Sequence, residues 1–180
     1  MEQREIRSLE DLYERYSGAV FRYLVRLSGD PHLSEDLMSE AFYKATLAMD
    51  GFRGEGSVKS WLLRIARNLY LSRARRERRT TSLEALEEDG VGFAATGDDP
   101  EEGLLRRERG RMIQRALSSL SETDRSVLLL SAEEKMRCKE IADVLGVSVT
   151  AVKVRLHRAR RRLVDALARE GLEDTRDVGL

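Results

Sequence analysis

The sequence predicts an all-α protein: two small helical domains joined by an acidic flexible linker, the second domain containing a helix-turn-helix. Apolar residues recur at helical spacing through most of the 180 residues, and the helix formers Leu, Ala, Glu and Arg are abundant. Only 13 residues are glycine and 2 are proline, too few turn formers for an all-β fold with many hairpins. Domains usually hold roughly 100–200 residues, so this length suits one ordinary domain or two small ones.

The composition argues against several classes of site and location. A single cysteine, Cys138, provides no disulfide framework and no cysteine-rich zinc site, and we assign it no chemistry. With His32 and His157 as the only histidines, we expect no metal centre and no cofactor. The longest strongly apolar run, residues 127–130, is far shorter than the roughly 20 residues that cross a bilayer. The amino-terminal residues lack a signal-peptide core, so we expect a soluble, cytoplasmic protein without membrane insertion.

Three amphipathic helices are predicted in the first 80 residues. The first covers residues 8–29 and ends at a Gly-Asp-Pro stop signal. A second helix is expected from a Ser34 cap to about residue 49, and a third from about residue 57 to residue 76. The expected core positions are Leu9, Leu12, Tyr13, Tyr16, Val20, Leu24, Leu27, Leu37, Ala41, Tyr43, Leu47, Val58, Trp61, Leu62, Ile65 and Leu69.

Residues 81–105 break the helical pattern and are predicted to form the linker. This segment contains eight Asp or Glu residues, no Lys or Arg, and four glycines. The flanking domains are expected at residues 8–80 and 106–170. In the second domain, Ser121 with Asp124 is typical of a capping box, and the last two helices are expected at about 138–145 and 149–169.

The formal net charge of zero conceals a strong asymmetry along the chain. Residues 51–80 contain nine Lys or Arg against two Asp or Glu, and residues 135–163 contain the same numbers. Two basic blocks on either side of an acidic one indicate two surfaces that bind polyanions. Ordinary solvated helix faces are the alternative explanation.

Residues 139–153 have the pattern of a helix-turn-helix. Ala142 is small where two helices cross closely, Gly146 suits the tight turn, and Ser148 can cap the second helix. Such a helix enters the major groove of DNA, although a plain amphipathic helix with a basic solvent face would look similar. The residues expected to contact DNA are Thr150, Lys153, Val154, His157, Arg158 and Arg161.

The third predicted helix carries the other basic face. Arg64, Arg67 and Arg75 lie on one flank at helical spacing, with Asn68 at its border. A row of this kind can follow a phosphate backbone, and an asparagine at its edge can hydrogen-bond a base. Favourable charge at the end of a helix accounts for one or two arginines, but not for the seven between residues 64 and 79.

These pieces together resemble the extracytoplasmic-function sigma factors, the small two-domain sigma subunits of bacterial RNA polymerase. Residues 36–45, DLMSEAFYKA, are similar to the family's polymerase-binding motif DLxQExFxxA, with Ser39 in place of glutamine. Residues 52–54 and 61–68 are similar to the segment that melts and reads the minus-ten element. The helix-turn-helix corresponds to the part that reads the minus-thirty-five element, and Lys135 replaces the usual glycine before it.

The resemblance implies promoter recognition, DNA melting and transcription initiation, with no catalytic residues in this chain. The implied partners are core RNA polymerase, through its β′ and β subunits, promoter DNA and an anti-sigma factor. The polymerase-binding residues would be Asp36, Leu37, Met38, Glu40, Phe42 and Lys44, and the minus-ten residues Phe52, Arg64, Arg67, Asn68 and Arg75.

Two other kinds of protein compete with this interpretation. The segment from residue 139 to residue 163 also resembles the LuxR-type DNA-binding domain of response regulators. That interpretation requires an upstream α/β receiver or ligand-sensing domain, and residues 1–80 show no strand pattern. An enzyme would require a phosphate-binding loop, a metal-ligand cluster or an activated nucleophile, and the sequence contains none of these patterns.

Overall fold

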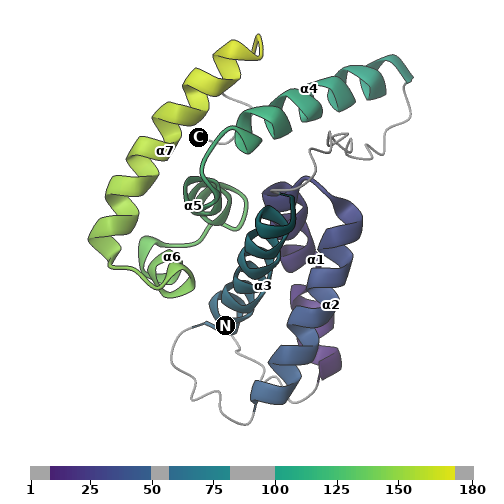
Figure 1. The fold of residues 1–180 in the computed structure, drawn as a ribbon, viewed down its shortest axis with the longest axis vertical. Helices are drawn as coiled ribbons and strands as arrows, with labels where there is room; N and C mark the ends of the chain where they lie inside the picture. The colour runs from purple at the N-terminus through teal and green to yellow at the C-terminus, as the bar shows by residue number, and fades with distance from the viewer. Residues whose placement is uncertain (1–8, 50–56, 82–99, 173–180) are drawn as a thin grey trace.

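The computed structural model describes residues 9–49, 57–81 and 100–172, and within these ranges the chain forms helices and no strands. This confirms the all-α prediction (Figure 1). The elements are α1 (Leu9–Ser28), α2 (Pro31–Ala48), α3 (Val58–Thr81), α4 (Pro100–Ser118), α5 (Glu122–Ala132), α6 (Cys138–Leu145) and α7 (Val149–Arg169).

The turn between α1 and α2 shows why the second helix begins earlier than predicted. Gly29 has a φ of 82°, a left-handed conformation that glycine adopts without strain. Asp30 is the N-cap of α2: its side chain accepts a hydrogen bond of 3.1 Å from the Leu33 backbone N–H, and Pro31 occupies the first turn. Ser34, the predicted cap, is instead buried inside the helix and donates to the Asp30 carbonyl at 2.6 Å.

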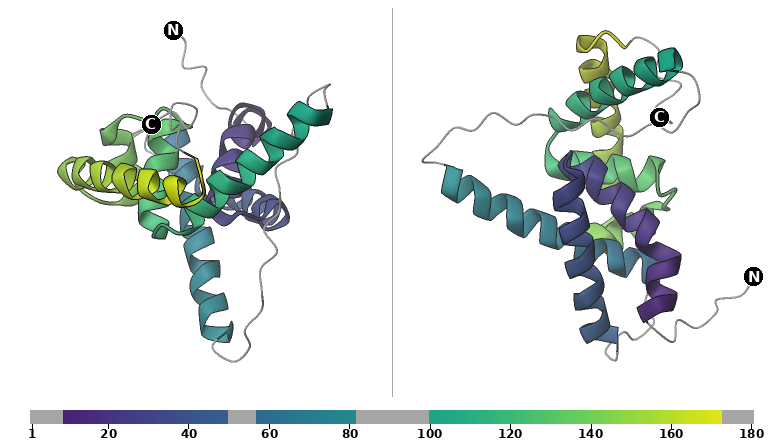
Figure 2. Two further views of the ribbon diagram at one scale, coloured as in Figure 1. Left: turned by 90° about the horizontal axis from the view of Figure 1, so that it is seen from above. Right: turned by 90° about the vertical axis from the view of Figure 1, so that its right-hand side faces the viewer.

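The boundaries of the predicted linker also differ from the structure. Helix α3 continues to Thr81, and Figure 2 shows its carboxyl-terminal half projecting from the body of the molecule. Residues 100–105, predicted as linker, belong to α4, because Pro100 provides a favourable first residue for a helix. The remainder of that segment, residues 82–99, lies outside the described residues.

The helix-turn-helix forms as the sequence predicts. Gly146 ends α6 in a left-handed conformation with a φ of 67°. Ser148 caps α7, its side-chain oxygen accepting a hydrogen bond of 3.2 Å from the Ala151 backbone N–H. Ser121 likewise caps α5, accepting from the Asp124 N–H at 3.2 Å. The inward stripe of α7 is buried as predicted and consists of Val152, Leu156, Ala159 and Leu163.

The two helical domains pack directly against each other. Helix α3 contacts α6, and α1 contacts α4 and α5, so that the buried apolar side chains form one continuous cluster. Leu63 and Ala66 are completely buried although no apolar periodicity predicted them, because α3 is covered on two sides. The prediction was wrong in the opposite direction for Tyr43 and Leu47 of α2. They were predicted as core positions but are 64% and 69% exposed. Leu9 and Tyr13, at the start of α1, are also exposed.

Candidate functional site

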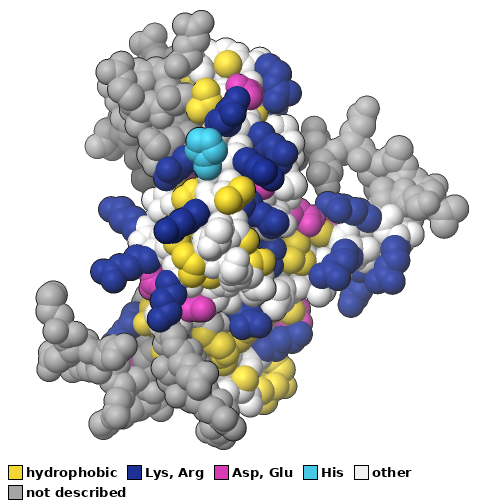
Figure 3. Space-filling view, turned by 90° about the vertical axis from the view of Figure 1, so that its left-hand side faces the viewer, with side chains coloured by type: hydrophobic (Ala, Val, Ile, Leu, Met, Phe, Trp, Pro, Cys, Tyr) yellow, Lys and Arg dark blue, Asp and Glu magenta, His cyan; other side chains and the backbone are white. Residues whose placement is uncertain are grey.

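Helix α7 presents a continuous polar and basic row to solvent. Its buried stripe turns the opposite face outward, and the six residues predicted to contact DNA are all exposed: Thr150, Lys153, Val154, His157, Arg158 and Arg161. Figure 3, which faces the side of the molecule on which α7 lies, shows Lys and Arg side chains spread over this surface. A capped, exposed helix with this composition has the form of a major-groove recognition helix.

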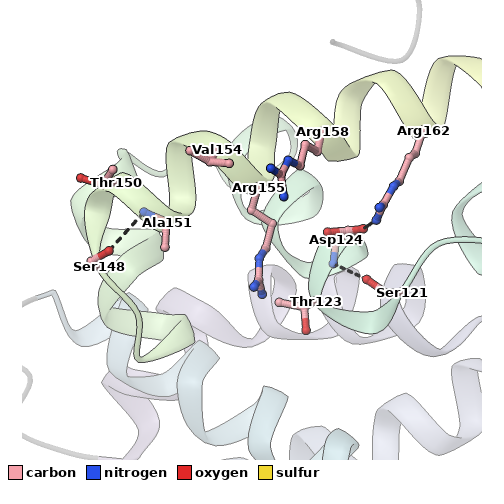
Figure 4. A pocket seen from close by; sticks show the side chains of 10 residues that line it. All are labelled: Ser121, Thr123, Asp124, Ser148, Thr150, Ala151, Val154, Arg155, Arg158 and Arg162. Atoms are coloured by element: carbon pink, nitrogen blue, oxygen red, sulfur yellow. Dashed lines mark hydrogen bonds and ion pairs between the residues drawn. The ribbon is translucent and has the colours of Figure 1, made fainter.

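A cleft of about 660 Å³ separates α7 from the amino-terminal end of α5. Arg155, Arg158 and Arg162 line one wall, and the other carries Ser121, Thr123 and Asp124 (Figure 4). Asp124 is only 5% exposed and accepts a hydrogen bond from Arg162. Arg155 and Arg158 face the amino-terminal end of α5 in this cleft, and positive charge beside a helix N-terminus is suited to a phosphate of a DNA backbone.

Arg155 is not among the residues that the sequence predicts to contact DNA, but it lines this cleft. It lies at the border of the buried stripe, and in Figure 4 its side chain extends across the cleft toward Thr123. The i, i+3, i+7 spacing of Arg155, Arg158 and Arg162 would have placed all three on one face. Only the tertiary structure shows that this face borders the start of α5.

The basic flank of α3 divides into an open part and a covered part. Arg64, Asn68 and Arg75 are exposed, as binding to a nucleic acid requires. Arg67, predicted for the same surface, is only 8% exposed, and its Nε donates a hydrogen bond of 3.3 Å to the Ser126 hydroxyl of α5. Arg67 is therefore not available to DNA in this arrangement. Phe52 lies outside the described residues.

Ion pairs neutralise part of the projecting end of α3. Arg73 Nε lies 2.6 Å from a carboxylate oxygen of Glu77, one turn along the helix. The guanidinium of Arg78 lies 2.6 Å from a carboxylate oxygen of Glu122, at the start of α5. Arg64 and Arg75, on the predicted DNA-binding flank, are exposed and take no part in these two pairs.

Some residues of the predicted polymerase-binding motif are buried in the amino-terminal domain, and others are exposed to solvent. Leu37 and Phe42 are each 4% exposed and pack inside the amino-terminal domain, and Met38 is partly buried. Asp36, Glu40 and Lys44 are exposed, and Glu40 and Lys44 form an ion pair of 3.0 Å one turn apart. Tyr43 and Leu47 lie on the same outward face of α2 and are exposed, although helix periodicity predicts them as core positions.

Residues 9–49, 57–81 and 100–172 contain no group of three or more His, Cys, Asp or Glu side chains placed to hold a metal ion. The helices in these ranges include none that is long and apolar enough to cross a bilayer. Cys138, at the first position of α6, is a partly buried free thiol that packs against the core.

Two sequence-family models and several curated proteins are similar to this chain. The family model Sigma-70 region 2 matches residues 12–80, and the model Sigma-70, region 4 matches residues 110–163. The sigma factor YlaC of Bacillus subtilis is 33% identical over 156 residues, which cover 87% of this chain and 90% of YlaC. The ECF sigma factor SigW of the same species is 30% identical over 159 residues, which cover 85% of each chain.

Two solved structures have a similar fold. The sigma factor RpoE of Bartonella quintana, in complex with the anti-sigma factor NepR, has a TM-score of 0.70 at 24% identity. That alignment covers 88% of this chain and 98% of RpoE. CnrH, in complex with the cytosolic domain of CnrY, has a TM-score of 0.65 at 26% identity, covering 89% of this chain and 87% of CnrH.

The competing response-regulator interpretation does not fit these findings. It required an α/β domain before the helix-turn-helix, whereas residues 9–49 and 57–81 form the three helices α1 to α3. The region 2 match covers those helices and the region 4 match covers the helix-turn-helix. The chain belongs to the extracytoplasmic-function sigma factors of the sigma-70 family, the promoter-recognition subunits of bacterial RNA polymerase.

Proposed function

We propose that this chain binds core RNA polymerase through the outward face of α2 and directs it to promoters through α3 and α7. The observation that supports this most strongly is the exposed basic row of α7, held by the Ser148 cap and the Gly146 turn. A sigma factor acts where the polymerase is, so we place the chain in the cytoplasm.

The minus-thirty-five duplex is the proposed ligand of α7. Lys153, His157 and Arg158 would face base edges, and a bidentate arginine contact to a base is worth about 1–3 kcal/mol of discrimination. Arg155 would bind a backbone phosphate in the cleft at the start of α5. In this proposal, the exposed row of α7 determines which DNA sequence is preferred. The phosphate contact in the cleft fixes the position of the helix along the duplex.

The minus-ten strand is the proposed ligand of α3. Asn68 lies on the exposed flank beside Arg64 and can hydrogen-bond a base that has left the stack. Unstacking a base costs a few kcal/mol, which protein contacts to the flipped base must offset. Trp61 is partly buried against the core, so we give it a packing role.

The polymerase-binding surface comprises the exposed residues of the α2 motif and the apolar side chains beside them. Glu40 and Lys44 would supply polar contacts, while Tyr43 and Leu47 offer apolar area to a partner. Leu37 and Phe42 would act indirectly, because their packing fixes the orientation of the helix. Glu40→Arg is expected to abolish binding of core polymerase while the chain stays helical.

Transcription in vitro tests the whole proposal. Purified core polymerase would be combined with the chain and sheared genomic DNA of the source organism, and RNA 5′ ends would be mapped. A sigma factor confers initiation at discrete sites on core enzyme, whereas a regulator acts only on polymerase that already carries a sigma factor. Random or absent initiation with core enzyme would contradict the proposal.

Permanganate footprinting at one mapped promoter separates the two DNA sites. Asn68→Ala is expected to leave closed-complex binding nearly intact but to slow strand opening. Arg158→Ala is expected to weaken closed-complex binding by about 1–3 kcal/mol if its contact is bidentate. If Asn68→Ala opens the promoter as fast as the unsubstituted protein, the minus-ten assignment is wrong.

We also propose that an anti-sigma factor binds this chain and prevents it from initiating transcription. Of the two similar structures, RpoE is in complex with the anti-sigma factor NepR, and CnrH is in complex with the cytosolic domain of CnrY. Native purification from uninduced cells tests this. Elution with a stoichiometric protein partner whose removal restores initiation supports it. Elution of the chain by itself, at its mass of 20.5 kDa, contradicts it.

A further inference from the structure

Val154 is an exposed apolar side chain in the middle of the polar and basic row of α7. It is 46% exposed, whereas Val152 and Leu156 on the opposite side of the helix are buried. Val154 lies one turn after Thr150 and one turn before Arg158, so it occupies the centre of the face that points to solvent. Valine is β-branched and forms helices less well than Ala, Leu or Arg. Neither core packing nor helix propensity therefore accounts for a valine at this position.

The surroundings of Val154 are cationic. In Figure 4 it lies within the first two turns of α7, between Thr150 and the arginines Arg155 and Arg158. Figure 3 shows apolar surface interspersed among Lys and Arg side chains on the side where α7 lies. An apolar group bordered by cations is complementary to the major groove of DNA, where phosphates flank the exposed base edges. The first turns of the second helix are also the part of a helix-turn-helix that contacts base edges.

The residue types of α7 limit how the helix can read an A·T base pair. Asparagine and glutamine are the side chains that pair with adenine through two hydrogen bonds, and α7 contains neither. Lys153 and Arg158 are suited to the two acceptors of guanine instead. An A·T pair presents one other distinctive group in the major groove, the C5-methyl group of thymine, which favours an apolar side chain. Val154 is placed to make that contact.

We propose that Val154 is a specificity-determining residue that packs against the C5-methyl group of a thymine in the minus-thirty-five element, with the methyl group of Thr150 beside it. The proposal rests on the proposed function, because it assumes that α7 enters the major groove of that element. Helix α7 then reads G·C pairs through hydrogen bonds from its cations and an A·T pair through apolar contact. The thymine can belong to either strand, since both orientations of the pair present the methyl group in the same groove.

Replacement of thymidine by deoxyuridine tests this contact, because deoxyuridine lacks only the C5-methyl group and keeps the same base pairing. Core polymerase carrying the chain would be titrated with the mapped promoter under conditions that retain the closed complex. Each thymine of the minus-thirty-five element, on either strand, would be replaced in turn. At least one replacement is expected to weaken binding about fourfold, the effect of losing one buried methyl group.

Substitutions at residue 154 assign the effect to this side chain. Val154→Ser removes both methyl groups, so the same DNA replacement should then change the affinity by less than about 1.5-fold. Val154→Ile keeps an apolar side chain and should retain the sensitivity to deoxyuridine. Serine and valine have similar helix propensities, and the position is exposed, so the variants are expected to fold.

Val164→Ser is the matched control. Val164 is another exposed valine of α7, 42% exposed, and it lies about 15 Å further along the helix axis than Val154. Polymerase carrying Val164→Ser should therefore lose about fourfold in affinity when the thymine is replaced, as the unsubstituted protein does.

Three results would overturn the proposal. The first is that no deoxyuridine replacement weakens binding by the unsubstituted protein. The second is that Val154→Ser remains as sensitive as the unsubstituted protein, which would assign the methyl effect to DNA shape or to another residue. The third is that Val154→Ser weakens assembly with core polymerase and leaves the sensitivity to deoxyuridine unchanged, which would identify a protein partner for this side chain.

Initiation is scored separately, so that failure of the proposed function can be distinguished. If initiation is normal and the methyl sensitivity is absent, only the role of Val154 is wrong. If the chain does not confer initiation, the proposed function is wrong, and duplexes selected by the free chain from a random pool replace the promoter. Weaker binding of their deoxyuridine forms, abolished by Val154→Ser, would still support the contact, and equal binding of both forms would overturn it.

Discussion

Tyr23 in α1 donates a hydrogen bond of 3.1 Å to the hydroxyl of Ser126 in α5, across 103 residues of sequence. Burial raises the pKa of Tyr23 from 10.0 to about 12, against smaller opposing effects of that hydrogen bond and of Arg67. The phenol is completely buried, so its ionisation is coupled to the integrity of both domains.

Alkaline pH is therefore expected to destabilise the fold through Tyr23. Below about pH 10 the phenol is neutral in both the folded and unfolded states, and its stabilising effect is complete. As the pH rises from about 10 toward 12, the unfolded chain ionises first and the free energy of unfolding falls, by roughly 1–3 kcal/mol in total. Urea unfolding across this range measures the loss, and Tyr23→Phe should lose less. Equal losses in the two proteins would show that Tyr23 is not responsible.

Arg125→Lys is expected to destabilise the protein by about 2–4 kcal/mol, because lysine cannot reproduce the planar fork of donors. Arg125 is 7% exposed and donates to the carbonyls of Leu117, Ser118 and Leu120 at the end of α4, as well as to Leu27. Chemical denaturation measures the difference. The exposed Arg115→Lys, whose side chain is 59% exposed, is the control and should change stability little. If both substitutions have a similarly small effect on stability, the hydrogen bonds from Arg125 to these carbonyls do not stabilise the fold.

Lys135→Gly is expected to stabilise the loop between α5 and α6 by about 0.5–1 kcal/mol. Lys135 has a φ of 51°, in the left-handed region, which costs a non-glycine residue roughly 1–2 kcal/mol. The larger backbone entropy of glycine in the unfolded chain offsets part of the gain. Lys135→Ala keeps the strain and should not stabilise, so thermal melting of the two variants separates backbone relief from loss of the side chain. If Lys135→Gly and Lys135→Ala melt at the same temperature, relief of backbone strain at residue 135 does not stabilise the protein.

Leu47→Glu is expected to weaken binding of core polymerase about tenfold or more, since burying a leucine contributes about 1.5–3 kcal/mol. Leu47 is 69% exposed on the outward face of α2, so the substitution should not affect folding. The matched control is Leu104→Glu, because Leu104 is 64% exposed on α4, outside the proposed surface. Binding of fluorescent chain to core polymerase compares the two. If both variants bind as the unsubstituted chain does, the apolar part of the surface is not used.

Arg155→Ala is expected to weaken binding to minus-thirty-five duplexes of different sequence to a similar degree. A phosphate contact carries no direct sequence information, and its loss reduces the slope of log K against log salt concentration by roughly 1. Arg158→Ala should instead change the order of preference among the duplexes. Titrations at several salt concentrations distinguish the two. A change of sequence preference in Arg155→Ala would assign that residue to base recognition.

Local sequence signals identified those features that depend on a few neighbouring residues. The Gly146 turn, the Ser148 cap and the buried stripe of α7 all follow from helix periodicity and from backbone groups that only nearby residues can satisfy. The family resemblance came from motifs in the same short segments. One local prediction was wrong: Ser34 was predicted to cap α2, but the helix begins at Pro31. Asp30 as N-cap and a proline in the first turn together favour this earlier helix start.

The sequence by itself determined the helical class, the helix-turn-helix and the two basic blocks, because periodicity and charge are written in consecutive residues. Only the tertiary structure decided which faces remain exposed. Periodicity shows that a helix has an apolar side but not how many neighbours cover the helix, so Leu63 is buried and Leu47 is not. The same limit applies to Arg67: its place on a basic flank is local, but its burial against Ser126 depends on a domain more than fifty residues away.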